Sequence, residues 1–513
     1  MSDHKNGRLT FREIDEGDKP TATYIFSEQN APSPGLIPGG RVDVIPDSPS
    51  SSSWSTKPLV ATLGDIFLPS GYPQSVSDDY LPYQVFDSLQ AFCSSIAGLL
   101  SSRAVLQGVG VGNADASPTS ALLLHILQDT SGRLATIFFA HRVGTALEPE
   151  CKTYRLAADV FNDIAMVLDC LSPMVPAGVM RVTVLSTAGV LRALCGVAGG
   201  SSKASLSAHF ARWGNLAELN AKDSSQETVI SLFGMLVGSV VISHISGFKT
   251  TWIALIILLT THLAMNYKAV RAVQMTSINR QRANIIFSTI LSQEYENNTT
   301  HTQSLKSNAQ PQSKSKLQES PLTIPSPAQV AYQERIFHTA NALQWIPVTS
   351  KPVKRAKLGT AEIGISLPTF LQNAGGSKKT SNSYQILVPI RELHTLFTEE
   401  EYMLFLSPRG RSTSRQWHAS ILLKKGCRIQ SQLKAWAHAL LAAHVLSETD
   451  IKIDVGAKHG SVEESVLEVV KSTLGFLNGG ARMERYLEAL VAEGWEVDIA
   501  ALETKGGRRI VCD

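Results

Sequence analysis

The sequence has few cysteines, and their spacing shows no metal-binding pattern. The six cysteines among 513 residues are Cys93, Cys151, Cys170, Cys195, Cys427 and Cys512. No two of them form a C-x-x-C pair, and no histidine lies at ligand spacing from them. We therefore predict reduced, mostly packed thiols facing the cytosol, and no metal site.

A strong excess of charge is also missing. The 47 Lys and Arg residues nearly balance the 44 Asp and Glu residues, and no dense basic stripe with interleaved aromatic residues occurs. Proteins that bind nucleic acid need clustered cations to neutralise phosphates. We therefore expect no nucleic-acid partner.

Motifs of catalysis and cofactor binding are absent as well. No G-x-S-x-G nucleophile motif occurs, and the glycines from Gly108 to Gly112 have the wrong spacing for a dinucleotide fingerprint. The segment from Gly196 to Ser205 misses the P-loop pattern, because Ser201 stands where the second glycine should be. We therefore expect a non-enzymatic protein without a cofactor.

The chain divides by composition into four regions. Residues 1–60 are rich in Ser, Pro, Gly and Asp, and residues 293–330 are rich in Gln, Ser, Lys and Pro, so both are expected to be disordered. Residues 61–292 carry long apolar stretches with helical periodicity, and residues 331–513 mix strand-like and helical patterns. The predicted fold is mainly α: an N-terminal helical, membrane-associated bundle followed by a small α+β C-terminal domain.

Two cap signals refine the helical region, and several short patterns refine the C-terminal one. Ser117-Pro118 predicts a helix start, and Ser224 to Glu227 has the form of a capping box. In the C-terminal region the patterns around residues 359–367, 400–408 and 417–426 predict strands, and those around 428–446, 462–477 and 481–494 predict helices. Residues 495–502 and the chain end from Arg508 are expected to complete the sheet.

Long uncharged runs near the middle of the chain indicate a membrane. Residues 229–245 contain no formal charge, and residues 250–267 are uncharged with aromatic residues, Trp252 and Tyr267, near both ends. Together they predict a transmembrane hairpin over residues 229–267. The alternative is a pair of core helices in a large soluble bundle. The opening residues mix acids and bases, which is typical of neither a secretory signal nor a transit peptide, so insertion is expected to use internal segments.

Basic residues predict the orientation of this hairpin. They lie before it (Lys203, Arg212, Lys222) and after it (Lys268, Arg271, Arg280, Arg282), whereas the turn holds Lys249. By the positive-inside rule, both flanks are expected in the cytosol. The sequence does not indicate which organelle membrane is used.

Small residues at four-residue spacing mark candidate helix contacts. Gly234 and Gly238 form a G-x-x-x-G pair inside the first predicted span, and Ser94, Gly98 and Ser102 form a similar ladder. Such residues let two helix backbones approach closely in lipid. We expect both sets to serve helix packing.

Residues 152–171 predict a helix with one ionic face. Arg155, Asp159, Asn162 and Asp163 fall on one side, and the apolar residues fall on the other. The preferred interpretation is an amphipathic helix with a solvated outer face. The alternative is that this face turns inward within a membrane bundle and forms a site for an ion or a polar solute.

Several stretches resemble the root UVB sensitive (RUS) family. They include YRLAADVFNDIAMVLD, LCGVAGGSSKASLSAHFARWGNLAELNAKDSSQETVISLFG and NYKAVRAVQMTSINRQRA, and the resemblance runs from about Leu63 to Ile290. It implies a membrane-associated protein without established enzymatic activity, linked in plants to ultraviolet-B responses and vitamin B6 homeostasis. The plant-type transit segment is not present, so a plastid location is not expected.

The resemblance leaves several functions open. The preferred one is a membrane bundle that handles a small polar solute or scaffolds a membrane complex; a soluble or peripheral scaffold is the first alternative. The expected partners are a lipid membrane and, through self-association or a family paralogue, another chain. Lys222 and Asp223, just before the hairpin, are expected to anchor it at the membrane surface. They could instead bind a small ligand, and Lys222 could form an imine with pyridoxal phosphate, although no phosphate cradle is evident.

Overall fold

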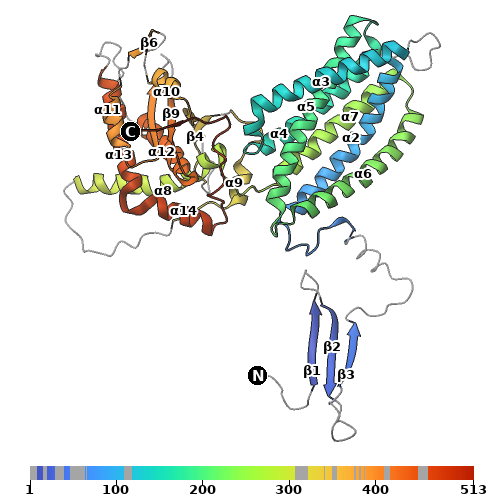
Figure 1. The fold of residues 1–513 in the computed structure, drawn as a ribbon, viewed down its shortest axis with the longest axis horizontal. Helices are drawn as coiled ribbons and strands as arrows, with labels where there is room; N and C mark the ends of the chain where they lie inside the picture. Colours follow the sequence, from blue (N-terminus) through green and yellow to red (C-terminus); the bar gives the residue numbers. More distant parts are fainter. Residues whose placement is uncertain are drawn as a thin grey trace. The chain divides into compact units, whose positions relative to one another are not determined.

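The structure is a computed structural model of the chain. It describes residues 8–14, 20–28, 40–46, 64, 66–108, 118–306, 322–339, 341–348, 355–374, 377–380, 383–385, 388–408, 416–448 and 460–512. The chain forms two compact units (Figure 1). Unit 1 comprises Met1–Gly112 and Ala204–Ala269, and unit 2 comprises Asn113–Lys203 and Val270–Asp513.

The first half of the chain holds three strands and the long helices. The strands are β1 (Arg8–Ile14), β2 (Pro20–Glu28) and β3 (Gly40–Pro46). The helices are α2 (Tyr80–Gly108), α3 (Pro118–Leu147), α4 (Cys151–Leu171), α5 (Val179–Phe210), α6 (Leu216–His244) and α7 (Phe248–Ala272), with the short 3₁₀ helix η1 (Ser172–Met174) after α4.

The second half alternates shorter helices and strands. Its elements are α8 (Arg280–Lys306), α9 (Pro327–Gln333), β4 (Ala342–Trp345), β5 (Ala356–Ile363), α10 (Leu367–Asn373), β6 (Ser377–Thr380), β7 (Ser383–Gln385), α11 (Ile390–Leu396), β8 (Tyr402–Pro408), β9 (Trp417–Lys424), α12 (Ile429–Glu448), α13 (Gly460–Asn478), η2 (Gly479–Ala481), α14 (Arg482–Ala492) and β10 (Arg509–Ile510). The predicted fold class, mainly α with a sheet-containing C-terminal region, is confirmed.

The prediction of a fully disordered tail over residues 1–60 is wrong for the part that the structure describes. β1, β2 and β3 form an antiparallel sheet with β2 in the centre. Alternating apolar residues in short runs, such as Leu9 and Phe11, supply the strand pattern. The Ser- and Pro-rich composition of the surrounding sequence concealed this pattern.

The helices of unit 1 are organised around α2. In Figure 1, α2 (blue) runs beside α6 (green). Arg103 of α2 also donates to Thr251 of α7. Gln84 near the start of α2 bonds to Asp223 of α6, and Leu99, further along α2, lies against Gly238, further along α6. The two helices therefore run in the same direction. The tight turn at residues 245–247 then reverses the chain into α7.

The C-terminal sheet of unit 2 is centred on β9. It pairs with β5 and β10 in parallel and with β8 antiparallel, and β4 adds to β5 antiparallel. Nearly every residue of β8 and β9 is buried, as expected of strands covered on both faces. The predicted strands around 359–367, 400–408 and 417–426 and the three predicted helices are confirmed. The predicted strand over residues 495–502 is wrong, since that segment is irregular apart from a bridge at Glu496.

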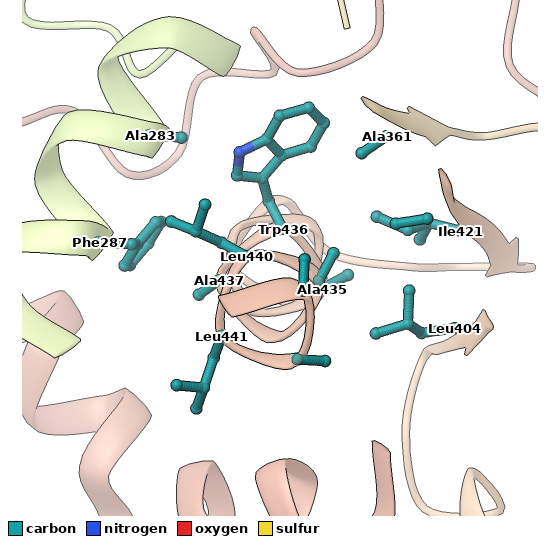
Figure 2. Close-up of a cluster of buried hydrophobic side chains, with 14 of the residues drawn as sticks. Ala283, Phe287, Ala361, Leu404, Ile421, Ala435, Trp436, Ala437, Leu440 and Leu441 are labelled. Atoms are coloured by element: carbon teal, nitrogen blue, oxygen red, sulfur yellow. The ribbon is translucent and has the colours of Figure 1, made fainter. Parts of the chain in front are cut away.

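The core of this region surrounds α12. Figure 2 shows Trp436 of α12 between Ala283 of α8 and Ala361 of β5. Leu440 points toward Phe287 of α8, and Ala435 faces Ile421 of the sheet. The indole nitrogen of Trp436 donates to Asn284 Oδ1 at 3.0 Å, so the one polar atom of this buried side chain has a partner. α12 is thus packed on both sides.

Two predicted boundaries are wrong for the same reason. The boundary between residues 292 and 293 falls inside α8, whose apolar residues Ile286, Phe287 and Ile290 belong to the C-terminal core. α3, α4 and most of α5 also group with the C-terminal region, so the helical region of residues 61–292 does not form one compact unit by itself. Periodicity identifies helices, but it does not show which helices pack together.

The two cap signals have different outcomes. α3 begins at Pro118 as predicted, while Ser117 lies outside the described residues. The capping-box prediction at Ser224 is wrong, because Ser224 lies inside α6, which begins two turns earlier at Leu216 after the N-cap residue Asn215.

Four helices in the described part of the chain are long and apolar enough to cross a membrane. They are α2, α5, α6 and α7. α6 and α7 contain the predicted hairpin, and α2 and α5 were not predicted as spans. Large apolar side chains on α6 and α7 are exposed, including Phe233, Leu236, Ile253 and Ile257. The helices are therefore compatible with membrane association.

Candidate functional site

The ionic face of α4 is buried. Arg155, Asp159 and Asp163 are only 8%, 7% and 5% exposed, and Asn162 is half-buried. The preferred interpretation of a solvated outer face is therefore wrong. A helical repeat places polar residues on one side, but it does not show whether that side meets water or another helix.

α5 covers this face within unit 2. Arg155 Nη1 donates to Asp159 Oδ1 at 3.0 Å within α4, and Arg192 of α5 pairs with Asp169 of α4. A Cβ atom at Gly199 of α5 would lie 3.6 Å from the Cβ of Ala158, so the two helices approach closely. We call Arg155, Asp159, Asp163, Asp169 and Arg192 the α4–α5 polar seam.

The apolar side of α4 is the more open one. Ile164 is 45% exposed, and Val160, Val167 and Leu168 are half-buried. α3 has the same character, with exposed side chains at Leu122, Leu123, Ile126, Leu127, Leu134, Ile137 and Phe138. In a water-soluble protein, a surface helix exposes its charged residues and buries its apolar ones. α4 shows the opposite distribution.

A buried ion cluster that the sequence did not indicate holds the start of α4. Lys152 Nζ lies 2.5 Å from Glu334 Oε2, and Arg282 Nε lies 3.0 Å from Glu334 Oε1. Burial disfavours the charged carboxylate, but Arg282 and Lys152 outweigh it and lower the pKa of Glu334 to about 2. Because the partners are 182 residues apart, only tertiary structure reveals the cluster.

Glu150 stands beside this cluster in a different environment. Burial raises its pKa to about 7, with Arg282 opposing and Glu334 reinforcing the shift. Its carboxylate lies 3.6 Å from His338 Nε2 and 3.4 Å from Asn279 Nδ2. Glu150 therefore titrates near neutrality at the junction of α3 and α4.

Asp223 and Lys222 lie on α6 in unit 1. Asp223 is buried and accepts a hydrogen bond from Gln84 Nε2 of α2 at 2.8 Å. Gln226, one turn later, donates to the Phe67 carbonyl at 2.6 Å. Lys222 is half-buried. Asp223 thus joins two helices of unit 1, a structural role that the sequence interpretation did not include.

The glycine pair of α6 lies against α2. A Cβ at Gly234 would come within 2.7 Å of the Ser95 Cβ, and a Cβ at Gly238 would come within 2.7 Å of Leu99 Cδ1. The predicted Ser94, Gly98 and Ser102 ladder is not this contact surface, because a Cβ at Gly98 meets nothing within 4 Å and Ser102 is exposed. The residues of α2 that face the two glycines are Ser95 and Leu99, each one position after a residue of the predicted ladder.

Arg103 of α2 binds the C-terminal end of α6. Its guanidinium donates to the carbonyls of Ile242 at 3.2 Å and Ile245 at 2.6 Å, and to Thr251 Oγ1 at 3.0 Å. These bonds satisfy carbonyls at the end of α6. The turn side of the hairpin thus holds Arg103 as well as Lys249.

The predicted polar site divides into two sets. Arg155, Asp159, Asn162 and Asp163 belong to unit 2, and Lys222 and Asp223 belong to unit 1. Within the described residues, no group of three or more His, Cys, Asp or Glu side chains is placed to hold a metal ion.

Comparison with known proteins identifies the helical region. Residues 53–294 match the family profile of the vitamin B6 photo-protection and homoeostasis domain. RUS family member 1 of Dictyostelium discoideum is 44% identical over 229 residues, which span 44% of this chain and 43% of that protein. Residues 53–294 of this chain therefore carry the RUS family domain.

More distant RUS relatives match beyond the helical region. Protein root UVB sensitive 3 of Arabidopsis thaliana is 28% identical over 388 residues, which span 75% of each chain. Root UVB sensitive 2 of the same plant, named as chloroplastic, is 23% identical over 397 residues, or 77% of this chain and 76% of that protein. No solved structure matches this chain. The names of the matched domain and of these relatives refer to vitamin B6 homoeostasis and to ultraviolet-B sensitivity.

Proposed function

We propose that this protein is a non-enzymatic, multi-pass membrane protein that handles a small polar solute at the α4–α5 polar seam. The observation that carries the proposal is the reversed burial of α4. Its charged residues Arg155, Asp159 and Asp163 are inside, and Ile164 is outside. In lipid, charged residues are kept where they pair with one another and serve an ion or solute pathway.

The proposed topology follows from the connections between helices. The segments between α3 and α4, α4 and α5, α5 and α6, and α6 and α7 are residues 148–150, 172–178, 211–215 and 245–247. Connections this short require each helix to begin on the side where the preceding one ends. If α6 and α7 cross, they cross in opposite directions, so the hairpin crosses the membrane an even number of times.

An even number of crossings supports the proposed cytosolic location of both flanks. The cations Arg212 and Lys222 precede the hairpin, and Lys268 and Arg271 follow it. The turn side carries Arg103 and Lys249, so the bias is smaller than the sequence suggested. The proposed orientation therefore rests on the basic residues at both flanks taken together.

Complementation tests the solute-handling proposal. In cells deleted for the endogenous gene, Asp159→Asn with Asp163→Asn should abolish function while abundance and membrane fractionation stay unchanged. Asp129→Asn on α3 is the matched control, because Asp129 is exposed and pairs only with its neighbour Arg133. Full function of the double variant would contradict the proposal.

A membrane scaffold is a second candidate, supported by the N-terminal sheet. Leu9, Phe11, Val42 and Val44 are more than half exposed, and their registers with Phe26 and Tyr24 place all six on one face. A sheet this small does not bury such a face by itself. Replacing Phe11 and Val44 with Thr should then abolish function, whereas the same change at Ile25 and Ile45, on the other face, should not.

A role in binding pyridoxal phosphate is less well supported. Lys222 is half-buried, and imine-forming lysines need a desolvated environment. Its neighbour Asp223 is engaged with Gln84. A reducible adduct on Lys222, detected by mass spectrometry after borohydride treatment, would favour this function over the one proposed.

A further inference from the structure

A polar cavity lies in the C-terminal region of unit 2, and no residue of the α4–α5 polar seam lines it. Its volume is about 220 Å³, and it lies where the turn after β5 meets the segment before β10. Its walls carry the side chains of Arg280, Asn341, Glu362, Ser366, Lys505 and Arg508.

Arg280 is held rigidly in the wall of this cavity. Its side chain comes from the first turn of α8 and is only 6% exposed. Nε donates to the Leu502 carbonyl at 2.6 Å, Nη1 donates to Asn341 Oδ1, and the guanidinium lies 5.9 Å from the Trp436 ring centroid. Nη2 has no hydrogen-bond partner among the described residues. A buried guanidinium with an unused N–H edge is a site for an oxyanion.

The backbone keeps the two walls of the cavity together. Arg508 N donates to the Gly364 carbonyl at 2.9 Å, and Gly364 N donates to the Ile421 carbonyl of β9 at 3.0 Å. Gly364 has a φ of +71°, which a residue with a Cβ rarely adopts, and a Cβ there would lie 3.0 Å from Glu503 Oε1. The segment that carries Lys505 and Arg508 is therefore fixed against the turn after β5.

The charges around the cavity favour an anion. Three cations line it, Arg280, Lys505 and Arg508, against one lining carboxylate, Glu362, which lies 3.6 Å from Lys505 Nζ. A second carboxylate, Glu503, lies beside Gly364 and pairs with Arg509. The hydroxyl groups of Ser366 and Thr369 add possible donors at the opposite wall. Pockets for drug-sized ligands have volumes of about 300–1,000 Å³, so this cavity suits a smaller ligand.

We propose that this cavity binds a small oxyanion, the phosphate or carboxylate group of a small molecule, with Arg280 as its fixed anchor and Arg508 and Lys505 closing over it. The site is independent of the α4–α5 polar seam. It gives the C-terminal region a ligand of its own.

Titration calorimetry on the full-length protein in detergent tests the proposal. The probes are inorganic phosphate and acetate, each at constant ionic strength adjusted with chloride. Saturable binding of either probe is expected, and the tighter one identifies the oxyanion. Arg508→Gln should weaken that binding about tenfold, because one charge-assisted hydrogen bond is lost. Absence of saturable binding by both probes would overturn the proposal.

Two further variants separate a defined site from general surface charge. Arg509 is the neighbour of Arg508 but pairs with Glu503, at 2.9 Å, and does not line the cavity. Arg509→Gln should leave the affinity unchanged, and Glu362→Gln should raise it because repulsion is removed. Equal weakening by Arg508→Gln and Arg509→Gln, or weaker binding by Glu362→Gln, would contradict a built site.

Discussion

Lys152 and Glu334, separated by 182 residues in the sequence, form a buried ion pair with 2.5 Å between Nζ and Oε2. Lys152 also donates to the Val273 carbonyl at 2.7 Å, so it contacts the segment that follows α7. The pair ties the start of α4, and hence the α4–α5 polar seam, to the C-terminal part of unit 2.

Breaking this pair should strongly destabilise unit 2. Glu334→Gln leaves Lys152 and Arg282 buried without their carboxylate, and we expect a loss of about 3–5 kcal/mol in the free energy of unfolding. Urea unfolding in detergent would measure it. Asp129→Asn, which removes an exposed pair with Arg133, should cost under about 1 kcal/mol. Similar small losses for both variants would show that the cluster contributes little.

Glu150 should contribute less to stability as the pH rises toward neutrality. Its pKa is raised from 4.5 to about 7 by burial, so the folded state holds a proton that the unfolded state has lost. This contribution is complete below pH 4.5 and is lost as the pH rises through about 7. The difference in unfolding free energy between the wild type and Glu150→Gln, measured from pH 5 to pH 8, should show this slope, because the other titrating groups are the same in both proteins. An unchanged slope in the variant would assign the effect to another group.

One introduced charge on the exposed face of α7 tests whether lipid surrounds this helix. Ile256 is 58% exposed, and if its surroundings are lipid, Ile256→Arg should cost about 2.5–3.5 kcal/mol of insertion free energy and lower the membrane-integrated fraction after alkaline carbonate extraction. Ile499→Arg, at an exposed position of the C-terminal region, is the control and should have no effect. Wild-type protein released into the soluble fraction would contradict the spanning helices altogether.

The contact between α6 and α2 should not tolerate a larger residue. Gly234→Leu places side-chain atoms where the Ser95 Cβ and the Phe92 carbonyl already lie within 3.0 Å of a Cβ. We expect a loss of about 1–3 kcal/mol, or more, visible as a lower melting temperature. Gly98→Ala, which meets nothing within 4 Å, should be neutral or stabilising. Equal melting temperatures for the two variants would refute close packing at Gly234.

Local patterns in the sequence predicted what depends on local order. Short-range periodicity or motif predicted the helical character of the long apolar stretches, the strands β5, β8 and β9, and the family resemblance. It also predicted a break between α6 and α7, although α7 begins earlier than expected, at Phe248. These features are accessible because the periods of 3.6 and 2 residues are written into consecutive positions.

Only the tertiary structure decided which way each face turns and which distant residues meet. The repeat in α4 places Arg155, Asp159 and Asp163 on one side, but burial of that side depends on α5. Residues far apart in the chain also meet in the Lys152–Glu334 pair, in the packing of α8 within the C-terminal core and in the cavity lined by Arg280. Such contacts depend on the packing of whole elements, and one sequence does not record that packing in any local pattern.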